Sequence, residues 1–328
     1  MNRLIFIAVL AVAAAFTSCK KDDKGRIFTV TFESNGGSAV EAISVKEGEK
    51  LTKPSLDPTK DGYAFAAWCK EVALTSEWEF DADEVTANMM LYAKWMKVKL
   101  VETATGYNGD IKKFEYDDQN RFTKCSFYNR GVATPYQIYT FTYSGDDLVQ
   151  LKLDYVSHHS ESTDEYAKNG NQITVTQTWR SSPNVFIYTL DLNSDGTLDK
   201  VTYSEDNWSE ETAYQYQDGN VTKASYKYIV DGIITDTNFN DYTYDSKNSP
   251  WLHCKTPKWL LIWFWGYDGY GSKNNMTASP WEDSNGNGGK AEFAYLYGDD
   301  GYPTQRTWKS YDKNGDKVGE WVAEYTYK

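Results

Sequence analysis

Alternation of apolar and polar side chains dominates the chain from residue 27 to its end. Residues 28–32, Phe-Thr-Val-Thr-Phe, are typical, and such a run places every second side chain on one face of a β-strand. Clusters of Asn, Asp, Gly and Ser, which favour turns, separate these runs. We therefore predict a mainly β protein with many short connections.

Residues 27–96 form the first predicted domain, and three motifs define it. Asn35-Gly36-Gly37 follows a first strand, Pro-Thr-x-x-Gly-Tyr-x-Phe-x-x-Trp occupies 58–68, and Leu-Tyr-Ala-x-Trp occupies 91–95. Together they resemble the internalin-B type repeat, also called the Listeria–Bacteroides repeat. The resemblance implies a small β-grasp-like domain that serves on bacterial surfaces as a spacer or protein-contact module, without catalytic residues.

A domain this small needs large apolar side chains to stabilise it. We therefore expect aromatic residues to form the core of the first domain. They are Phe32, Tyr63, Phe65, Trp68, Tyr92 and Trp95.

Residues 97–328 form the second predicted domain, which holds all of the 26 tyrosines except Tyr63 and Tyr92. Each of its segments consists of a strand with alternating apolar and polar residues, a polar turn and a second strand of the same kind. Examples are Phe114–Tyr128, Tyr139–Leu151, Tyr188–Tyr203, Tyr214–Tyr226 and Tyr295–Trp308. Serial hairpins build an antiparallel meander, and a long sheet either closes or leaves adhesive edges. We expect a sheet curled into a barrel-like domain.

The turn-and-tyrosine pattern of this second domain, which includes Gly301-Tyr302-Pro303, is similar to a Bacteroidetes lipoprotein domain family of unknown function with a porin-like fold. It also resembles, more loosely, the tyrosine–aspartate repeats of bacterial surface and toxin-shell proteins. These resemblances imply an envelope location and no particular active site.

Residues 1–18 have the pattern of a lipoprotein signal peptide: a short positive head, an apolar run at 4–16, and Thr-Ser before Cys19. The run is too short to span a bilayer as a helix. Cys19 is therefore predicted to be the first mature residue and to hold the protein on the outer membrane through acyl chains. Residues 19–26 form a lipidated tether. Lys20–Lys24 resembles a Bacteroidetes surface-export signal, which implies display on the cell exterior, although a plain solvated tether explains it as well.

The charge balance excludes nucleic acid as a partner. Without the signal, which contains Arg3 and no acid, 33 basic residues oppose 47 acidic ones, a net charge of −14. Such a field repels phosphate backbones. Hydrophobic residues make up 40% and aromatic residues 16% of the chain, enough to build packed cores.

Three cysteines remain after Cys19, namely Cys69, Cys125 and Cys254, and none belongs to a Cys-x-x-Cys motif. The spacing favours reduced thiols packed in the core, and a Cys125–Cys254 disulfide remains the alternative. Neighbouring His158 and His159 would point to opposite faces of a strand, so zinc chelation is not supported. We predict no cofactor.

Asp191, Asn193 and Asp195 fit the start of a calcium loop, with Gly196 at the bend. Thr202 stands where an EF-hand needs Glu, and these residue types are also the best turn formers, so a turn is favoured over a metal site. The acidic pairs Glu205-Asp206, Glu210-Glu211 and Asp299-Asp300 could supply glycosidase carboxylates only if they converged at a fixed separation.

The segment Trp259–Trp265 is seven apolar residues, too short to cross a membrane. As a strand or as a short helix it would most simply plug the barrel. The alternative is a ligand platform in which Trp259, Trp263 and Trp265 offer their rings to a sugar or a protein.

We therefore predict a non-enzymatic, acylated envelope lipoprotein with an adhesion or ligand-binding role. Its expected partners are the membrane, through Cys19, and a host or bacterial surface protein or glycan. A glycan-binding accessory protein of a polysaccharide-use system is the alternative, and a glycan-degrading enzyme is the rival class.

Overall fold

The computed structural model describes residues 25–106, 109–266 and 269–328. Its strands and loops divide between two compact units, one ending at Lys97 and the other covering Val98–Lys328. The predicted signal peptide, Cys19 and most of the tether lie outside the described residues.

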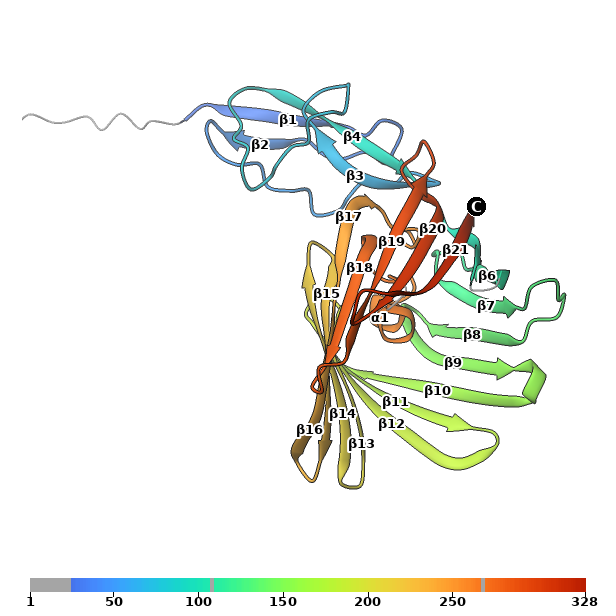
Figure 1. The fold of residues 1–328 in the computed structure, drawn as a ribbon. Coiled ribbons are helices and arrows are strands. Elements are labelled where there is room, and N and C mark those ends of the chain that lie inside the picture. Colours follow the sequence, from blue (N-terminus) through green and yellow to red (C-terminus); the bar gives the residue numbers. More distant parts are fainter. Residues whose placement is uncertain (1–24, 107–108, 267–268) are drawn as a thin grey trace, which may run out of the picture. The chain divides into compact units, whose positions relative to one another are not determined.

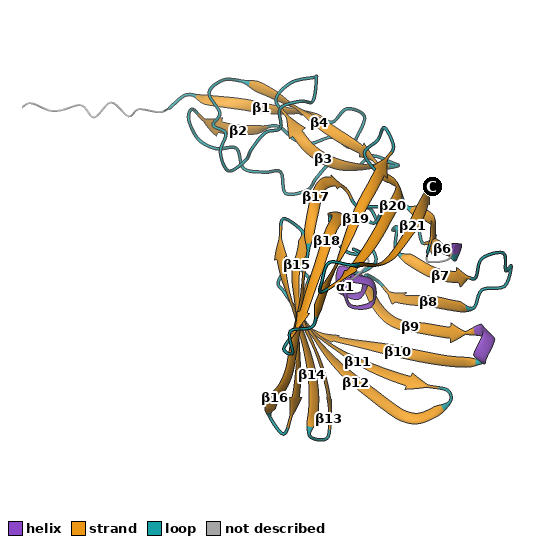
Figure 2. Cartoon of the chain, in the orientation of Figure 1, coloured by secondary structure: helices purple, strands orange, loops and turns teal. Residues whose placement is uncertain are grey.

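The first unit is a mixed four-stranded sheet in the order β2-β1-β4-β3. Its strands are β1 (Ile27–Glu33), β2 (Ile43–Lys46), β3 (Tyr63–Cys69) and β4 (Met89–Lys97). The central pair β1–β4 is parallel, and both edge strands are antiparallel to their neighbours. Figure 2 shows only strands and loops among the described residues of this unit. The sheet confirms the β-grasp-like prediction.

The turn after β1 explains why its sequence is Asn-Gly-Gly. Asn35 and Gly36 have φ angles of 48° and 84°, the left-handed region that these residue types tolerate best. At Gly37 a Cβ atom would lie 2.3 Å from the Trp95 ring. The indole Nε1 of Trp95 in turn donates a hydrogen bond to the Ser34 carbonyl, 2.8 Å away. The conformation of the turn and the position of the Trp95 ring therefore depend on each other.

The core of this unit surrounds Trp68, which is 1% exposed. Phe32 and Phe65 pack against it with ring centroids 4.7 and 5.2 Å away, and Trp95 contacts Phe65. Two of the six expected core residues are not there. Tyr63 is 42% exposed with the Lys60 ammonium over its ring, and Tyr92 is only partly buried. Tyr92 alternates with the buried positions Leu91 and Ala93, so the pleat turns it outward, whereas Tyr63 is the first residue of β3 and lies at the exposed end of that strand.

The second unit is a closed barrel in which neighbouring strands follow one another in chain order. Figure 1 shows these strands fanning around a common interior. The first half of the barrel comprises β5 (Val101–Thr105), β6 (Ile111–Tyr116), β7 (Phe122–Tyr128), β8 (Gln137–Ser144), β9 (Asp147–Tyr155), the 3-10 turn Val156–His158, β10 (Ser160–Asn169), β11 (Gln172–Trp179) and β12 (Ser182–Leu192). The second half comprises β13 (Leu198–Glu205), β14 (Trp208–Gln217), β15 (Asn220–Val230), β16 (Ile233–Asp241), β17 (Thr243–Asn248), β18 (Asn274–Asp283), β19 (Gly288–Tyr297), β20 (Pro303–Asp312) and β21 (Lys317–Tyr327).

The barrel closes because β21 pairs antiparallel with β5. An up-and-down meander closes this way only with an even number of strand positions. β16 and β17 together occupy one position, since both pair with β18 and only Tyr242 separates them. The predicted mainly β, barrel-like fold is confirmed.

A long connection, residues 249–273, enters the barrel interior between β17 and β18. It contains helix α1 (Lys258–Trp265), so the strand alternative for this segment is wrong. The carbonyl of Pro257 accepts hydrogen bonds from the backbone N–H groups of Leu260 and Leu261 and starts the helix. No helix among the described residues is long and apolar enough to span a bilayer.

The two faces of the barrel wall differ in polarity. Inward positions contribute Phe, Tyr, Trp, Leu and Val to a continuous core around α1. Outward positions carry lysine–acid pairs directly opposite one another on neighbouring strands at several places around the circumference. These pairs are Lys124–Glu115, Lys200–Asp191, Lys223–Asp241 and Lys309–Glu320. A transmembrane barrel has the reverse arrangement, with an apolar band facing lipid.

Candidate ligand-binding cavity

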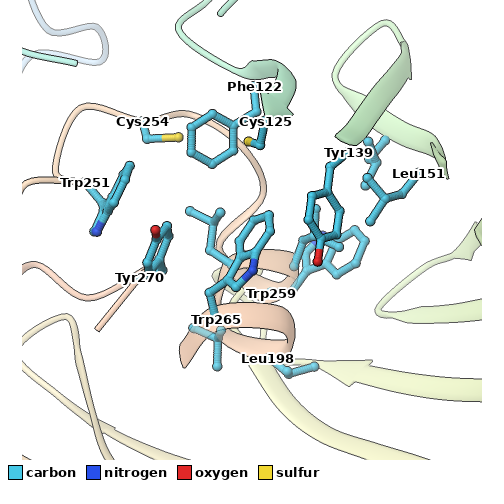
Figure 3. Close-up of a cluster of buried hydrophobic side chains, with 14 of the residues drawn as sticks. Phe122, Cys125, Tyr139, Leu151, Leu198, Trp251, Cys254, Trp259, Trp265 and Tyr270 are labelled. Atoms are coloured by element: carbon cyan, nitrogen blue, oxygen red, sulfur yellow. The ribbon is translucent and has the colours of Figure 1, made fainter. Parts of the chain in front are cut away.

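Two tryptophans of α1 are packed into the barrel core. Trp259 is 7% exposed and lies 5.3 Å from the Tyr166 ring. Trp265 is 5% exposed and contacts the rings of Tyr139 and Tyr270 at 5.3 and 5.4 Å. Figure 3 shows Trp265 at the centre of this cluster. These rings have no free face for a ligand.

Trp263, on the same helix, lies in different surroundings. It is only partly buried, and its ring contacts Tyr188 of β12 at 5.3 Å. Two adjoining cavities, of about 270 and 220 Å³, border it. Both cavities share Trp263, Glu210 and Thr212 in their walls. Of the three tryptophans predicted as a platform, the structure places Trp263 alone against these spaces.

The cavity wall is made by the inner faces of β12 to β15. Strand register sets Tyr188, Tyr203, Glu210 and Tyr228 directly opposite one another on these four successive strands. Because opposite residues share a face of the sheet, the four side chains form one row around the barrel. A second row places Thr212 between Val201 and Tyr226.

Aromatic rings line most of the larger cavity. The ring of Tyr203 lies 5.0 Å from that of Tyr188, 5.4 Å from that of Trp208 and 6.2 Å from that of Phe186. Trp263, on the helix side, and Glu210 line the same cavity as these rings. The smaller cavity continues past Glu210 toward Tyr214, Tyr226, Tyr242 and Ile262.

Glu210 is the acidic residue of both cavity walls. It is partly buried, and burial raises the pKa of its carboxyl group above the ordinary value. Within the described part of the chain it has no hydrogen-bond or ion-pair partner. Burial, and then the charge of Glu210, also raise the pKa of Tyr228. The charge of Glu210 thus acts on the barrel interior without a counter-ion among the described residues of the protein.

A second carboxyl group of the barrel, that of Asp164, lies on β10, two strands before β12. It is 3% exposed, and burial raises its pKa to about 6. The side-chain amide of Gln177 donates a hydrogen bond to it at 2.9 Å. Burial raises the pKa of Tyr188, and the charges of Asp164 and Glu210 raise it further.

A depression of about 510 Å³ borders the turn between β14 and β15. Its walls are mostly polar turn and strand-end residues, among them Asp218, Ser246 and Lys273. Ligand sites usually combine apolar walls with a few convergent polar groups. The cavities at Trp263 have that character, and the polar depression does not.

The calcium candidate residues make a turn. Asp195 accepts hydrogen bonds from the backbone N–H and hydroxyl of Thr197, and Asn193 donates to the same hydroxyl. Asp191 accepts a hydrogen bond from Gln172 and pairs with Lys200 at 3.6 Å. Among the residues that the structure describes, no group of three or more His, Cys, Asp or Glu side chains is placed to hold a metal ion.

The remaining candidates lie apart from the cavities. Cys69, Cys125 and Cys254 are free and buried, and Figure 3 shows the last two on either side of Phe122. His158 ends a 3-10 turn and His159 follows it, so they do not lie in a strand as expected.

The acidic pair Glu210 and Glu211 is split by the strand, because neighbouring strand positions face opposite sides of the wall.

Sequence reasoning considered Glu210 only as part of an acidic pair that could supply glycosidase carboxylates, and it missed the position of this residue in the cavity. The signal that could have found it is local. In Trp208-Ser-Glu210-Glu-Thr212-Ala-Tyr214, every second residue belongs to the inner face, so Glu210 stands in line with Trp208 and Tyr214. An acid on the aromatic face of a strand points to the interior.

Comparison with known proteins assigns the first unit. Residues 28–94 match the Listeria–Bacteroides repeat domain, which confirms the resemblance seen in the motifs. A protein of Evansella cellulosilytica named as a Gly-rich membrane protein is 44% identical over 92 residues, 28% of this chain and 10% of that protein. A membrane protein of the same organism is 42% identical over 69 residues, 21% of this chain and 10% of that protein. The chain spans about a tenth of the length of these relatives.

Crystal structures of two porin-like proteins are among the solved structures to which this chain is similar. The protein from Bacteroides uniformis has a TM-score of 0.44 and 13% identity, covering 70% of this chain and 97% of its own. The protein from Bacteroides vulgatus has a TM-score of 0.35 and 9% identity, covering 70% of this chain and 99% of its own.

Proposed function

We propose that this protein is a non-enzymatic envelope lipoprotein, anchored through Cys19 and facing the cell exterior, whose barrel binds a small ligand. The observation that carries the binding role is the pair of aromatic cavities, both of which have Trp263 and Glu210 in their walls. Aromatic walls with one unpaired polar group are typical of small-molecule sites.

Lipid anchoring is supported by the signal pattern of residues 1–18 and by the outer face of the barrel. Lysine–acid pairs on that face stay solvated in water and are costly in hydrocarbon. Acyl chains on Cys19 therefore offer a membrane attachment that leaves the barrel in water. Two relatives named as membrane proteins match part of this chain, which supports a location at a membrane.

The repeat domain acts, in this proposal, as a spacer or protein-contact module. Its aromatic core lies within its own sheet, around Trp68. Such a domain can hold a second domain away from the bilayer without contributing to the ligand site.

A non-enzymatic role is supported by the acidic pairs. Glu210 faces the interior and Glu211 faces the opposite side, so this pair does not converge on a glycosidic bond as a glycosidase requires. Asp300 pairs with Lys99. Glycan capture is the second candidate function, because sugar rings stack well on an indole such as that of Trp263.

Two measurements test this proposal. Membrane fractionation of cells expressing wild type or Cys19→Ala should place only the wild type in the outer membrane, and proteinase added to intact cells should degrade it. For the binding role, the mature chain with Cys19→Ala should bind a small molecule or glycan from a screened library, and Trp263→Ala should lose that binding. A variant that binds as well as the parent would contradict the cavity as the site.

A further inference from the structure

We propose that the cavity at Trp263 binds a small organic cation, such as a quaternary or alkyl ammonium group, with Glu210 as its counter-ion. This inference rests on the proposed ligand-binding function and names the chemistry of the ligand. Three features of the cavity, as its described residues form it, lead to this inference: an unpaired carboxyl group, a wall of aromatic rings, and the absence of a basic side chain among those residues.

The first feature is the carboxyl group of Glu210. Removing a carboxylate from water is costly unless a partner compensates for it. Elsewhere in the chain partly buried acids have such partners, for example Asp117 with Arg121 at 2.8 Å and Asp300 with Lys99. Among the described residues Glu210 has none. A bound cation would supply the missing partner.

The second feature is the aromatic wall. The faces of aromatic rings carry negative electrostatic potential, and a cation within about 6 Å of a ring centroid is attracted to it. Trp263, Tyr188, Tyr203 and Trp208 form a continuous series of ring contacts beside Glu210. The rings and the carboxylate both attract positive charge, so each of these two parts of the wall favours a cation.

The third feature is what the wall leaves out. No lysine, arginine or histidine is among the described residues that line the two cavities. The hydroxyl of Tyr203 donates a hydrogen bond to Glu205 at 2.8 Å, which places another carboxylate beside this wall. An anionic ligand would meet repulsion here and no compensating group.

The cavity size limits the cation. A volume of about 270 Å³ is at the small end of ligand sites. A neutral sugar could stack on Trp263, but it would leave the charge of Glu210 without a counter-ion. A compact ammonium ion with an apolar surface satisfies both the rings and the carboxylate.

The test compares a cation with a neutral molecule of the same shape. Choline and 3,3-dimethylbutan-1-ol differ in the charged nitrogen and not in outline, and n-butylammonium represents primary amines. Isothermal titration of the mature chain with Cys19→Ala should detect binding of at least one cation, about tenfold tighter than that of the neutral alcohol. If neither cation binds, or if choline and the alcohol bind equally, the inference is overturned.

Glu210→Gln tests the counter-ion, because it removes the charge and keeps the size. It should weaken cation binding about tenfold and leave binding of the neutral alcohol unchanged. Glu211→Gln is the matched control: the same chemical change, one residue along, on the opposite face of β14, with no effect expected. Equal losses in both variants would contradict a local role for Glu210.

Trp263→Phe tests the rings without deleting the side chain, since phenylalanine retains a weaker π-face. It should weaken cation binding by less than Trp263→Leu does, and equal losses would contradict a cation–π contribution. If a screened glycan binds at Trp263 while both cations fail, the proposed binding function stands and the cation assignment falls. Failure of every probe and every library compound would instead overturn the binding function itself.

Discussion

The two sides of helix α1 face different parts of the same barrel wall. On the side of Trp265, the strands β7 and β8 supply the large side chains of Phe122, Tyr139 and Phe141, whose ring centroids lie 5.3 to 6.5 Å from that of the indole. On the side of Trp263, β14 supplies Glu210 and Thr212, and space remains. A plug helix thus seals a barrel only where the wall provides complementary side chains.

The comparison shows that aromatic composition alone does not distinguish a core from a site. Trp259 and Trp263 are four residues apart and so project from the same side of the helix, yet one is buried and the other lines a cavity. The difference lies in the partner strands, since Tyr166 covers Trp259 while Trp263 adjoins a polar position.

The largest expected effect is that of Trp265→Ala on stability. Deleting a fully packed indole removes its transfer free energy and leaves a cavity, so the free energy of unfolding should fall by about 3–5 kcal/mol. Urea denaturation followed by far-ultraviolet circular dichroism measures the change. A loss below about 1 kcal/mol would mean that the Trp265 side is as open as the Trp263 side.

The repeat domain offers a sealed aromatic core for reference. We expect residues 27–96 alone to fold cooperatively, because the contacts of Trp68 lie within that unit. Trp68→Ala should then lower the free energy of unfolding of the fragment by about 3–5 kcal/mol. A fragment that shows no cooperative unfolding transition would refute its independence from the barrel.

A smaller effect, of about 3 kcal/mol, is expected for the pH dependence of the unfolding free energy that the buried carboxyl group of Asp164 causes. Its folded pKa of about 6 exceeds the unfolded value of about 3.9, so the folded state binds the proton more tightly. Stability from this group is fully present below about pH 4 and is lost as pH rises through about 6, at about 1.4 kcal/mol per pKa unit.

Asp164→Asn is the matching variant, because asparagine keeps an acceptor for Gln177 and cannot ionise. The difference in unfolding free energy between pH 4 and pH 7 should shrink by about 2 kcal/mol in this variant, because part of the full effect is already lost at pH 4. An unchanged pH profile would show that the interior near Asp164 is well solvated, unlike the packed side of α1.

Much of the fold could be predicted from the sequence, because its signals are local. The alternation in each hairpin, the Asn35-Gly36 turn and the tyrosine-rich strands indicated β structure and a meander curled into a barrel-like domain, whose closure the structure shows. The helical form of residues 258–265 could not be chosen, since an apolar run without polar positions has no periodicity to read. The site needed the strand register, which sets Glu210 opposite Tyr203 and Tyr228 and is decided by pairing across the barrel.

The claim that the two sides of α1 differ is tested most directly by measuring the unfolding free energy of Trp263→Ala beside that of Trp265→Ala. Trp263 is partly buried against open space, so its truncation should cost about 1 kcal/mol, well below the loss of about 3–5 kcal/mol at Trp265. That gap is the expected result. Equal losses of about 3–5 kcal/mol would show that Trp263 is packed as tightly as Trp265 and would contradict a ligand cavity beside it.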